Sequence, residues 1–358
     1  MHALSPSPAR GLAPRLGRAR ELSRAAVVGL AGLAALLILV VIHIQQGTAA
    51  LDAGTVLSAM IAPDGSPQHT VVRHARLPRV AAGMVAGAAL GAAGVLLQAA
   101  MRNPLASAST VGVNAGAYLA VVAAAIYAPV LTGWSSPLVA FAGGLLAAAA
   151  VYLLASGDAA PARLALAGMA TTIALGSVTT VLIMFHEYTV GGLFFWGAGS
   201  LVQRNWSAVS ASWPWVAALG LVATVALARG LDVLELGDDV STSLGHNVQR
   251  ARLAATLTGV LLAAFSVVVA GSIAFVGLVA PHLIRLAGVR HHAQLIPLAA
   301  LWGAVLLVGA DVLGRLVAGP MNELPAGVFT AAVGAPFLIW LARRAGRSGG
   351  GRRPPSAP

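Results

Sequence analysis

Apolar runs of about twenty residues follow one another along most of the chain, separated by short polar, glycine- or proline-containing segments. A helix of roughly twenty apolar residues is long enough to cross a hydrocarbon core of about 30 Å. The runs show no polar face, so a soluble fold with buried helices does not fit them. The sequence therefore predicts an all-α, polytopic membrane protein built as a bundle of about ten membrane helices. The candidate spans are roughly 25–46, 78–100, 111–131, 136–156, 162–185, 206–228, 253–271, 272–288, 295–317 and 324–342.

Both ends of the chain are polar and rich in arginine, so we expect residues 1–24 and 343–358 to be cytoplasmic tails of a membrane domain spanning 25–342. The first apolar run is too long for the apolar region of a signal peptide. Alternating the spans places seventeen of the 22 basic residues on the cytoplasmic side. This excess of positive charge inside has the sign that the positive-inside rule requires. The five arginines left on the outer side are Arg73, Arg76, Arg79, Arg204 and Arg315.

Composition excludes several functional classes. The chain is 58% hydrophobic and 9% charged, it has no cysteine, and all 22 of its basic residues are arginines. Without lysine it has no Walker A loop and no Schiff-base nucleophile. Without cysteine it has no disulfide and no thiolate site. The net charge of +11 comes from tails and short loops, which indicates membrane topology and not nucleic-acid binding. His282, His291 and His292 lack further ligands at fitting spacing, so no metal site is predicted.

Two stretches at membrane depth do not read as plain helices. Asn103 and Pro104 interrupt one helix, and Gly271, Gly277 and Pro281 interrupt another. Irregular backbone inside a membrane is tolerated only where it is buried in protein or lines a cavity. In transporters such breaks often mark the substrate pathway. We therefore predict that these five residues lie at helix breaks along a pathway.

The longest hydrophilic stretch inside the chain is 229–252, on the cytoplasmic side of the predicted topology. Asp238 can start a short helix there, and Gly245 can end it. A short helix across the cytoplasmic face suits contact with a soluble partner. An ordinary solvated loop explains the same composition, and these features alone leave both interpretations open.

A series of motifs in chain order resembles the FecCD family, the permease subunits of type II ATP-binding-cassette importers for iron-siderophores, haem and cobalamin. The similarity runs from about residue 70 to 342, and ferric-siderophore permeases look most similar. Met321 and Asn322 depart from the family pattern, as do the long arginine-rich tails. The motifs of the first half are Arg76-Leu77-Pro78-Arg79, Gly87-Ala88-Ala89-Leu90, Gln98, Arg102-Asn103-Pro104-Leu105-Ala106 and Gly112-Val113. Those of the second half are Leu236-Gly237-Asp238-Asp239, Ser243-Leu244-Gly245, Ala270 to His282, Leu295 to Leu298, Ala310 to Arg315, Glu323 to Val328 and Gly334 to Phe337.

The resemblance implies a multi-pass subunit in the cytoplasmic (inner) membrane of a bacterium. It implies a second permease subunit, forming a homodimer or a heterodimer, two ATPase subunits below and a periplasmic or lipoprotein substrate-binding protein outside. The chain would be a transport subunit and not an enzyme, with no catalytic residue and no cofactor of its own. ATP and Mg²⁺ would bind to the partner ATPase. The function implied is translocation of an iron-siderophore or a related metal chelate by alternating access.

The resemblance also implies roles for individual residues. Arginines at the positions of Arg76, Arg79 and Arg315 would meet carboxylates of the binding protein, because the guanidinium fork pairs well with carboxylate. An ion pair within one helix competes with this role at Arg315, since Asp311 lies four residues earlier. The residues implied to couple to the ATPase are Leu236, Gly237, Asp238, Asp239, Ser243, Leu244 and Gly245.

Three further segments carry expectations. Glu323 is interpreted as an acid near a helix start. Residues 191–197, after His186 and Glu187, resemble a short external helix beneath the binding protein. The turn 157–163 is a candidate part of an inner gate.

The competing function is an ion-coupled secondary transporter. Such proteins usually bury several acids or histidines near the middle of the bilayer, and Asp311 is the one clear candidate in this sequence. An intramembrane enzyme is a weaker alternative, because the spans carry no convincing Ser/His or HExxH arrangement.

Overall fold

The computed structural model describes residues 9–47, 51–131, 136–155, 161–191, 193–202, 204–319 and 324–349. Within these ranges the chain is helical and contains no strand. Seven helices are long and apolar enough to cross a membrane, and three shorter apolar helices accompany them. Together they correspond in order to the predicted spans, so the expected all-α membrane bundle is confirmed. The membrane helices are α1 (Ala9–Gln45), α4 (Leu77–Ala100), α5 (Val113–Tyr127), α6 (Ser136–Leu154), α7 (Pro161–Phe185), α10 (Trp206–Val222), α13 (Val248–Ala270), α14 (Val276–Leu286), α15 (His292–Ala318) and α16 (Ala326–Gly349).

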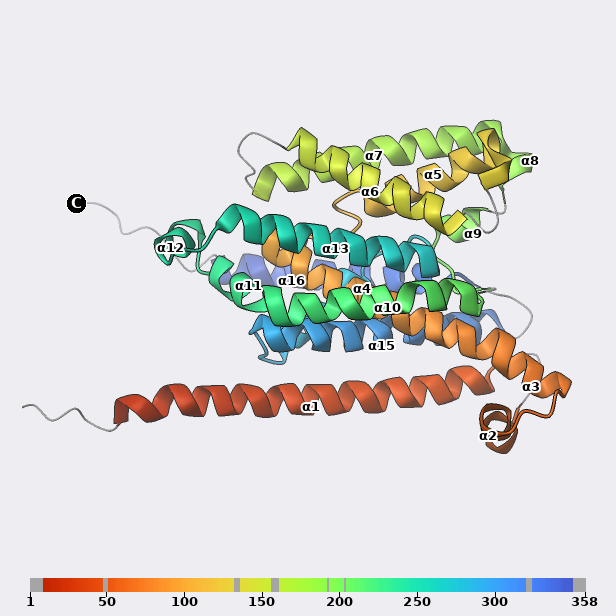
Figure 1. The fold of residues 1–358 in the computed structure, drawn as a ribbon, viewed down its shortest axis with the longest axis horizontal. Helices are drawn as coiled ribbons and strands as arrows, with labels where there is room; N and C mark the ends of the chain where they lie inside the picture. The colour runs from red at the N-terminus through yellow and green to blue at the C-terminus, as the bar shows by residue number, and fades with distance from the viewer. Residues whose placement is uncertain are drawn as a thin grey trace, which may run out of the picture.

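Short helices lie at the two ends of the bundle. A π-helical turn, Ala223–Leu227, joins α10 to α11 (Ala228–Leu234), and α12 (Asp238–Ser243) follows. In Figure 1, α12 lies at one end of the bundle, and α2 (Ala53–Ile61) and α3 (Pro67–Val71) lie at the other. The arginine bias predicts that the α12 end faces the cytoplasm, and we call it the cytoplasmic end on that basis. A short helix expected within 191–197 is present as α9 (Leu193–Gly197), and another, α8 (Glu187–Val190), precedes it.

Some boundaries differ from the predictions. α1 begins at Ala9, so part of the predicted polar tail continues the first membrane helix as helix. α5 starts only after Gly112, whose φ of +81° ends the preceding loop. The predicted span 272–288 contains only the 11 residues of α14. Gly277 and Pro281 lie inside α14, so they do not form the interruption, which runs from Gly271 to Phe275.

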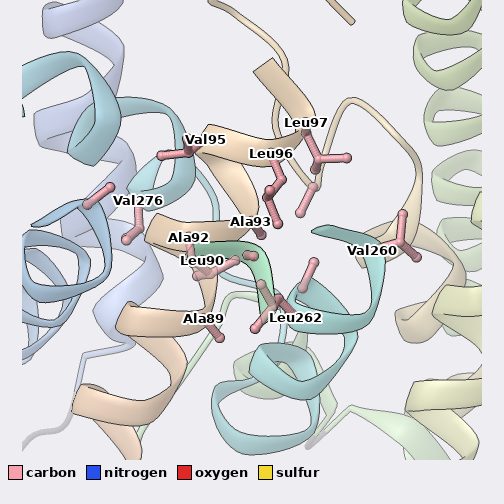
Figure 2. Packing of buried hydrophobic residues seen from close by; sticks show 14 of the residues in the cluster. Ala89, Leu90, Ala92, Ala93, Val95, Leu96, Leu97, Val260, Leu262 and Val276 are labelled. Atoms are coloured by element: carbon pink, nitrogen blue, oxygen red, sulfur yellow. The ribbon is translucent and has the colours of Figure 1, made fainter. Parts of the chain in front are cut away.

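Helix α4 is the centre of the molecule. Figure 1 shows it between α10, α13 and α15, with α1 along one edge of the bundle and α5, α6 and α7 along the other. Its leucines, including Leu96 and Leu97, meet Val260 and Leu262 of α13 and Val276 of α14 in one apolar cluster (Figure 2). Only 11% of the most apolar window of α1 and of α7 is buried, so these outer helices face lipid or another chain.

Glycines allow the central helices to approach one another closely. A Cβ on Gly87 would collide with the backbone of Gly303, and a Cβ on Gly91 with the carbonyl of Ala299. A Cβ on Gly94 would meet the carbonyl of Gly277 in α14, and a Cβ on Gly277 would meet the carbonyl of Leu90, so this crossing needs glycine on both helices. In lipid, where apolar burial gives little drive for association, such close packing holds helices together. The result is a tightly packed block of α4, α14 and α15.

Candidate coupling and docking sites

The segment from α11 to α13 forms the candidate coupling site at the cytoplasmic end. Gly237 has a φ of +108° and turns the chain from α11 into α12. Gly245, with a φ of +77°, turns it away again before α13. Ser241 is buried and donates its hydroxyl to the carbonyl of Val233 at 2.8 Å, which fixes α12 against α11. The predicted short helix between Asp238 and Gly245 is therefore confirmed.

The exposed face of the α11–α12 segment is apolar, although the segment lies at the end of the bundle and outside the membrane-spanning helices. Leu236 is 60% exposed, Val240 is 47% exposed and Leu244 is 65% exposed. Asp239 and Ser243 are exposed beside them. Exposed apolar side chains rimmed by polar ones are typical of a surface that a partner covers. The predicted coupling residues thus occur together on one surface element.

Asp238 ties α12 to the rest of the bundle. Its two carboxylate oxygens each accept a hydrogen bond from Nη2 of Arg252 on α13, both at 3.1 Å. Arg102 lies 3.7 Å away on its other side. Arg252 also donates its Nε proton to the carbonyl of Ala100 at 3.0 Å, at the end of α4. One buried guanidinium therefore joins the coupling helix to both α13 and α4.

A second connection links α11 to α15. Asp232 accepts hydrogen bonds from the backbone N–H of His292 at 2.9 Å and from its Nδ1 at 2.6 Å. Glu21 of α1 accepts from the backbone N–H groups of Arg290 and His291 just before α15. The free N–H groups at a helix start favour such carboxylates. Sequence reasoning missed this connection, because the partners are about 60 to 270 residues apart.

The outer end of the bundle contains the three arginines predicted for docking, and each already contacts its own chain. Arg79 forms a two-pronged ion pair with Asp311, with Nε to Oδ2 at 2.8 Å and Nη2 to Oδ1 at 3.0 Å. Nε2 of His43 lies 2.7 Å from the same carboxylate. Asp311 is 1% exposed and Arg79 is 6% exposed, so this cluster is inside the protein. Asp311 therefore has a structural role, and it joins three helices (α1, α4 and α15).

The other two arginines of the set bind the last carbonyl groups of α1. Arg76 donates to the carbonyl of Ile44 and is 5% exposed. Arg315 donates to the carbonyls of His43 at 3.3 Å and Gln46 at 2.8 Å. Cations at a helix C-terminus satisfy free carbonyls and complement the helix dipole. As a cluster, Arg76, Arg79 and Arg315 with Asp311 carry two more positive than negative charges, while the exposed Asp52, Asp64 and Glu187 lie at the same end of the molecule.

The exposed basic residue at the outer end is one that the motif comparison did not select. Arg73 is exposed on the π-helical turn Val72–Arg76. Its carbonyl accepts a hydrogen bond from Nε1 of Trp206 at 2.8 Å, which fixes the turn against α10. Its position on the outer side followed from the arginine count, but its exposure could be seen only in the fold.

The two helix breaks are held by protein groups. Arg102 has a φ of +46°, unusual for a residue with a side chain, and Asn103 accepts the backbone N–H of Leu105 at 2.9 Å. In the second break, the carbonyl of Ala270 accepts from the N–H of Ser200 at 3.0 Å. Nδ2 of Asn114 donates to the carbonyl of Ile273 at 3.0 Å. The second break therefore has protein partners for its carbonyls, as irregular backbone at membrane depth requires. The first lies at the α12 end of the bundle, where Arg102 is 3.7 Å from Asp238.

The remaining predictions concern Glu323, the inner-gate turn and the histidines. Glu323 and most of the predicted inner-gate turn at 157–163 lie outside the described residues. In the part of the chain that the structure describes, no group of three His, Asp or Glu side chains is placed to hold a metal ion. His291 and His292 contact Glu21 and Asp232 as ion-pair partners.

Comparisons with known proteins agree with this architecture. The sequence model of the FecCD transport family matches residues 35–344. The chain is 41% identical over 282 residues to the Fe(3+)-citrate import system permease protein YfmD of Bacillus subtilis, covering 78% of this chain and 84% of that protein. It is 41% identical over 277 residues to the Fe(3+) dicitrate transport system permease protein FecD of Escherichia coli, covering 77% and 86%.

A solved structure has the same fold. It is described as an inward-facing conformation of a metal-chelate type ABC transporter, and it superposes with a TM-score of 0.76 at 26% identity. The superposition covers 89% of this chain and 99% of that one. A match over most of the sequence, two relatives above 40% identity and a shared fold leave one conclusion. This multi-pass membrane chain belongs to the FecCD transport family.

Proposed function

We propose that this chain is a permease subunit of a bacterial ATP-binding-cassette importer that carries iron-siderophore-type metal chelates across the cytoplasmic membrane. Membership of the FecCD transport family, whose members named above include permeases for ferric citrate, supports this class of cargo. The observation that carries the proposal is the α11–α12 element, an exposed apolar surface tied by ion pairs to the central helices. A secondary transporter has no need of such an element.

The coupling site would bind a separate ATPase, because this chain has no lysine to build a phosphate-binding loop of its own. ATP and Mg²⁺ would therefore bind to that partner. Val240 and Leu244 would enter a groove on the ATPase, and Asp238 would pass movement of α12 to Arg252. Since Arg252 also binds the end of α4, displacement of α12 would act directly on the central helix.

The outer end would receive a substrate-binding protein. We assign the direct contact to Arg73, which is exposed, and the surrounding positive field to Arg76, Arg79 and Arg315. Together with Asp311 these three guanidinium groups form a locally positive cluster, which attracts carboxylates on a partner and speeds their encounter. The importer would be completed by a second permease subunit, a copy of this chain or a related one, against the exposed faces of the outer helices.

The test is transport in proteoliposomes. The full chain is reconstituted with its cognate ATPase and substrate-binding protein, and uptake of radiolabelled ferric citrate and of ferric catecholate and hydroxamate chelates is measured. We expect uptake of at least one chelate to require ATP, Mg²⁺ and the binding protein, and to survive collapse of ion gradients. Uptake by the chain alone, driven by a proton or sodium gradient, would contradict the proposal.

The docking assignment has a separate test in the same vesicles. Arg73→Glu should weaken the binding protein's affinity and reduce its dependence on salt, because a charge at the edge of an interface acts mainly on association. Arg290→Glu makes the same charge change at an exposed position on the cytoplasmic end and serves as the control. Equal affinities for the two variants would remove Arg73 from the docking surface.

A further inference from the structure

A polar cavity lies at the cytoplasmic end of the bundle, next to the coupling site but separate from its apolar face. Its volume is about 440 Å³. Its wall combines the end of α4, the break that follows α4, the end of α11 and the middle of α14. The lining residues are Gln98, Ala99, Arg102, Asn103, Pro104, Glu235, His282 and Arg285.

The cavity contains a positively charged side chain, Arg285, whose hydrogen-bonding side-chain partner among the described residues is neutral. Arg285 donates from Nη1 to the side-chain oxygen of Gln98. Gln98 in turn donates from Nε2 to the carbonyl of Gly277 at 3.4 Å, so its oxygen stays turned toward Arg285. Among the described residues Arg285 has no carboxylate within ion-pair distance, in contrast to Arg79 and Arg252. Glu235 on the same wall acts on Arg285 only from beyond ion-pair distance. An anion in direct contact with this partly buried guanidinium would therefore be stabilised there.

The neighbouring side chains add donors on the same wall. His282 lies three residues before Arg285 on α14, hence on the same side of that helix. Its Nδ1 is buried and has no hydrogen-bond partner in the described structure. Asn103 uses its oxygen to accept from Leu105, which leaves its amide protons for another acceptor. Arg102, in the break that follows α4, also lines the cavity, and its side chain is 43% exposed.

The charge balance of the wall favours an anion. Two arginines line the cavity against a single acid, Glu235, which also lies 3.7 Å from Nε2 of His292. Asp238 is shared between Arg102 and Arg252, and it holds the latter by the shorter contacts. Guanidinium groups and amide donors around a space of this size fit a multi-oxygen anion, which accepts several hydrogen bonds at once.

We propose that this cavity is an oxyanion site that binds a phosphate or carboxylate group, held chiefly by Arg285 with Arg102, His282 and Asn103. Two sources share this chemistry. One is the headgroup of an anionic phospholipid in the inner leaflet, since basic pockets between membrane helices on the cytoplasmic side bind such headgroups. The other is a free anion of the cytoplasm. The site does not depend on what the chain transports.

The experiment measures binding to the full-length chain without ATPase or cargo. Thermal unfolding is followed in a zwitterionic detergent while inorganic phosphate or citrate is titrated against sodium chloride of equal ionic strength. In parallel, the unfolding temperature of the chain is compared between nanodiscs of phosphatidylcholine alone and nanodiscs in which roughly one lipid in five is phosphatidylglycerol. A ligand that binds only the folded protein raises its unfolding temperature in a saturable way.

The variants identify the site. Losing a hydrogen bond to a charged group weakens binding about 10-fold or more, so Arg285→Gln should raise the apparent Kd by at least that factor. Arg102→Gln, at a more exposed position, keeps the test valid if Arg285→Gln does not fold, and we expect it to weaken binding in the same direction. Arg290→Gln removes the same charge from the same end of the protein outside the cavity and should leave the Kd unchanged.

The two arms separate the sources. A saturable shift with phosphate or citrate that needs Arg285 assigns the site to a free anion, and a shift only with phosphatidylglycerol assigns it to a headgroup. No shift beyond that of sodium chloride in either arm would overturn the proposal. So would equal affinity of the wild type, Arg285→Gln and Arg102→Gln.

Discussion

The ion pair between Arg79 and Asp311 can be tested by a double-mutant cycle, which also decides whether Arg79 is mainly structural. The carboxylate is 1% exposed and receives two hydrogen bonds from the guanidinium. Removing one member of a buried pair leaves the other charge unpaired and costs about 3–5 kcal/mol. We therefore expect Asp311→Leu to lower the free energy of unfolding by this amount. Arg79→Met should lie at the lower end of the range, because His43 stays 2.7 Å from the carboxylate.

The double variant distinguishes coupling from simple addition. With Arg79→Met and Asp311→Leu together no buried charge remains unpaired, and the neutral ring of His43 loses its partner, a cost of about 1–3 kcal/mol. If the two changes were independent, their costs of about 3 and about 3–5 kcal/mol would add to about 6–8 kcal/mol. We therefore expect the free energy of unfolding of the double variant to be equal to or higher than that of either single variant.

Unfolding is measured by titrating the detergent-solubilised chain with sodium dodecyl sulfate and following the fluorescence of its seven tryptophans. Glu187→Leu removes an exposed acid at the same end and should change the free energy by no more than about 0.5 kcal/mol. The reasoning fails if Arg79→Met is as stable as this control, or if the costs of the two single variants add in the double variant. A stable Arg79→Met that loses only its response to the binding protein would assign Arg79 to docking instead.

Three further variants test the coupling site and the packing. Arg252→Met should lower the amount of chelate taken up per ATP hydrolysed several-fold while the ATPase still binds. Arg250→Met, which changes an exposed arginine two residues earlier on α13, should leave this ratio unchanged. An equal ratio in the two variants would refute the prediction. Val240→Asp should weaken co-purification of the ATPase about 10-fold or more, because burying such a side chain is worth about 1.5 kcal/mol, and unchanged co-purification would contradict it. Gly91→Leu should reduce the yield of folded, monodisperse protein on size exclusion, because the new leucine side chain would meet the carbonyl of Ala299. Overpacking of this kind costs about 3 kcal/mol or more. A normal yield would refute the close approach of α4 and α15.

The order of the apolar helices and their approximate number could be predicted from hydropathy, because each crossing needs its own apolar run whatever it packs against. The short helix α12 was also predictable, since Asp238 and Gly245 are local signals for a helix start and end. The length of α14 was not. The apolar pattern runs on through Gly271 without a break in the sequence. The irregular segment is stabilised by tertiary hydrogen bonds, from Ser200 to the carbonyl of Ala270 and from Asn114 to the carbonyl of Ile273.

The charged residues show the same limit. The spacing of Asp311 and Arg315 suggested an ion pair within one helix, because neighbours on a helix can be read from the sequence. In the fold Arg79, 232 residues away, forms the two-pronged pair with Asp311. Which distant helix supplies a buried partner depends on tertiary packing, and one sequence carries no record of it. For the same reason Arg285 could not be told from the arginines that have acidic partners.

The attachments of α4 limit how the protein can move. At the outer end Arg79 fixes α4 to α15 through Asp311, and at the inner end the carbonyl of Ala100 is bound to Arg252 beside α12. Between these points its glycines meet backbone on α14 and α15, where a closely packed interface slides or bends only at the expense of many contacts. A push on α12 therefore moves α4, α14 and α15 together as one body. The change of shape that alternating access requires must then be absorbed where helical hydrogen bonding is already interrupted, in the segments after Ala100 and after Ala270.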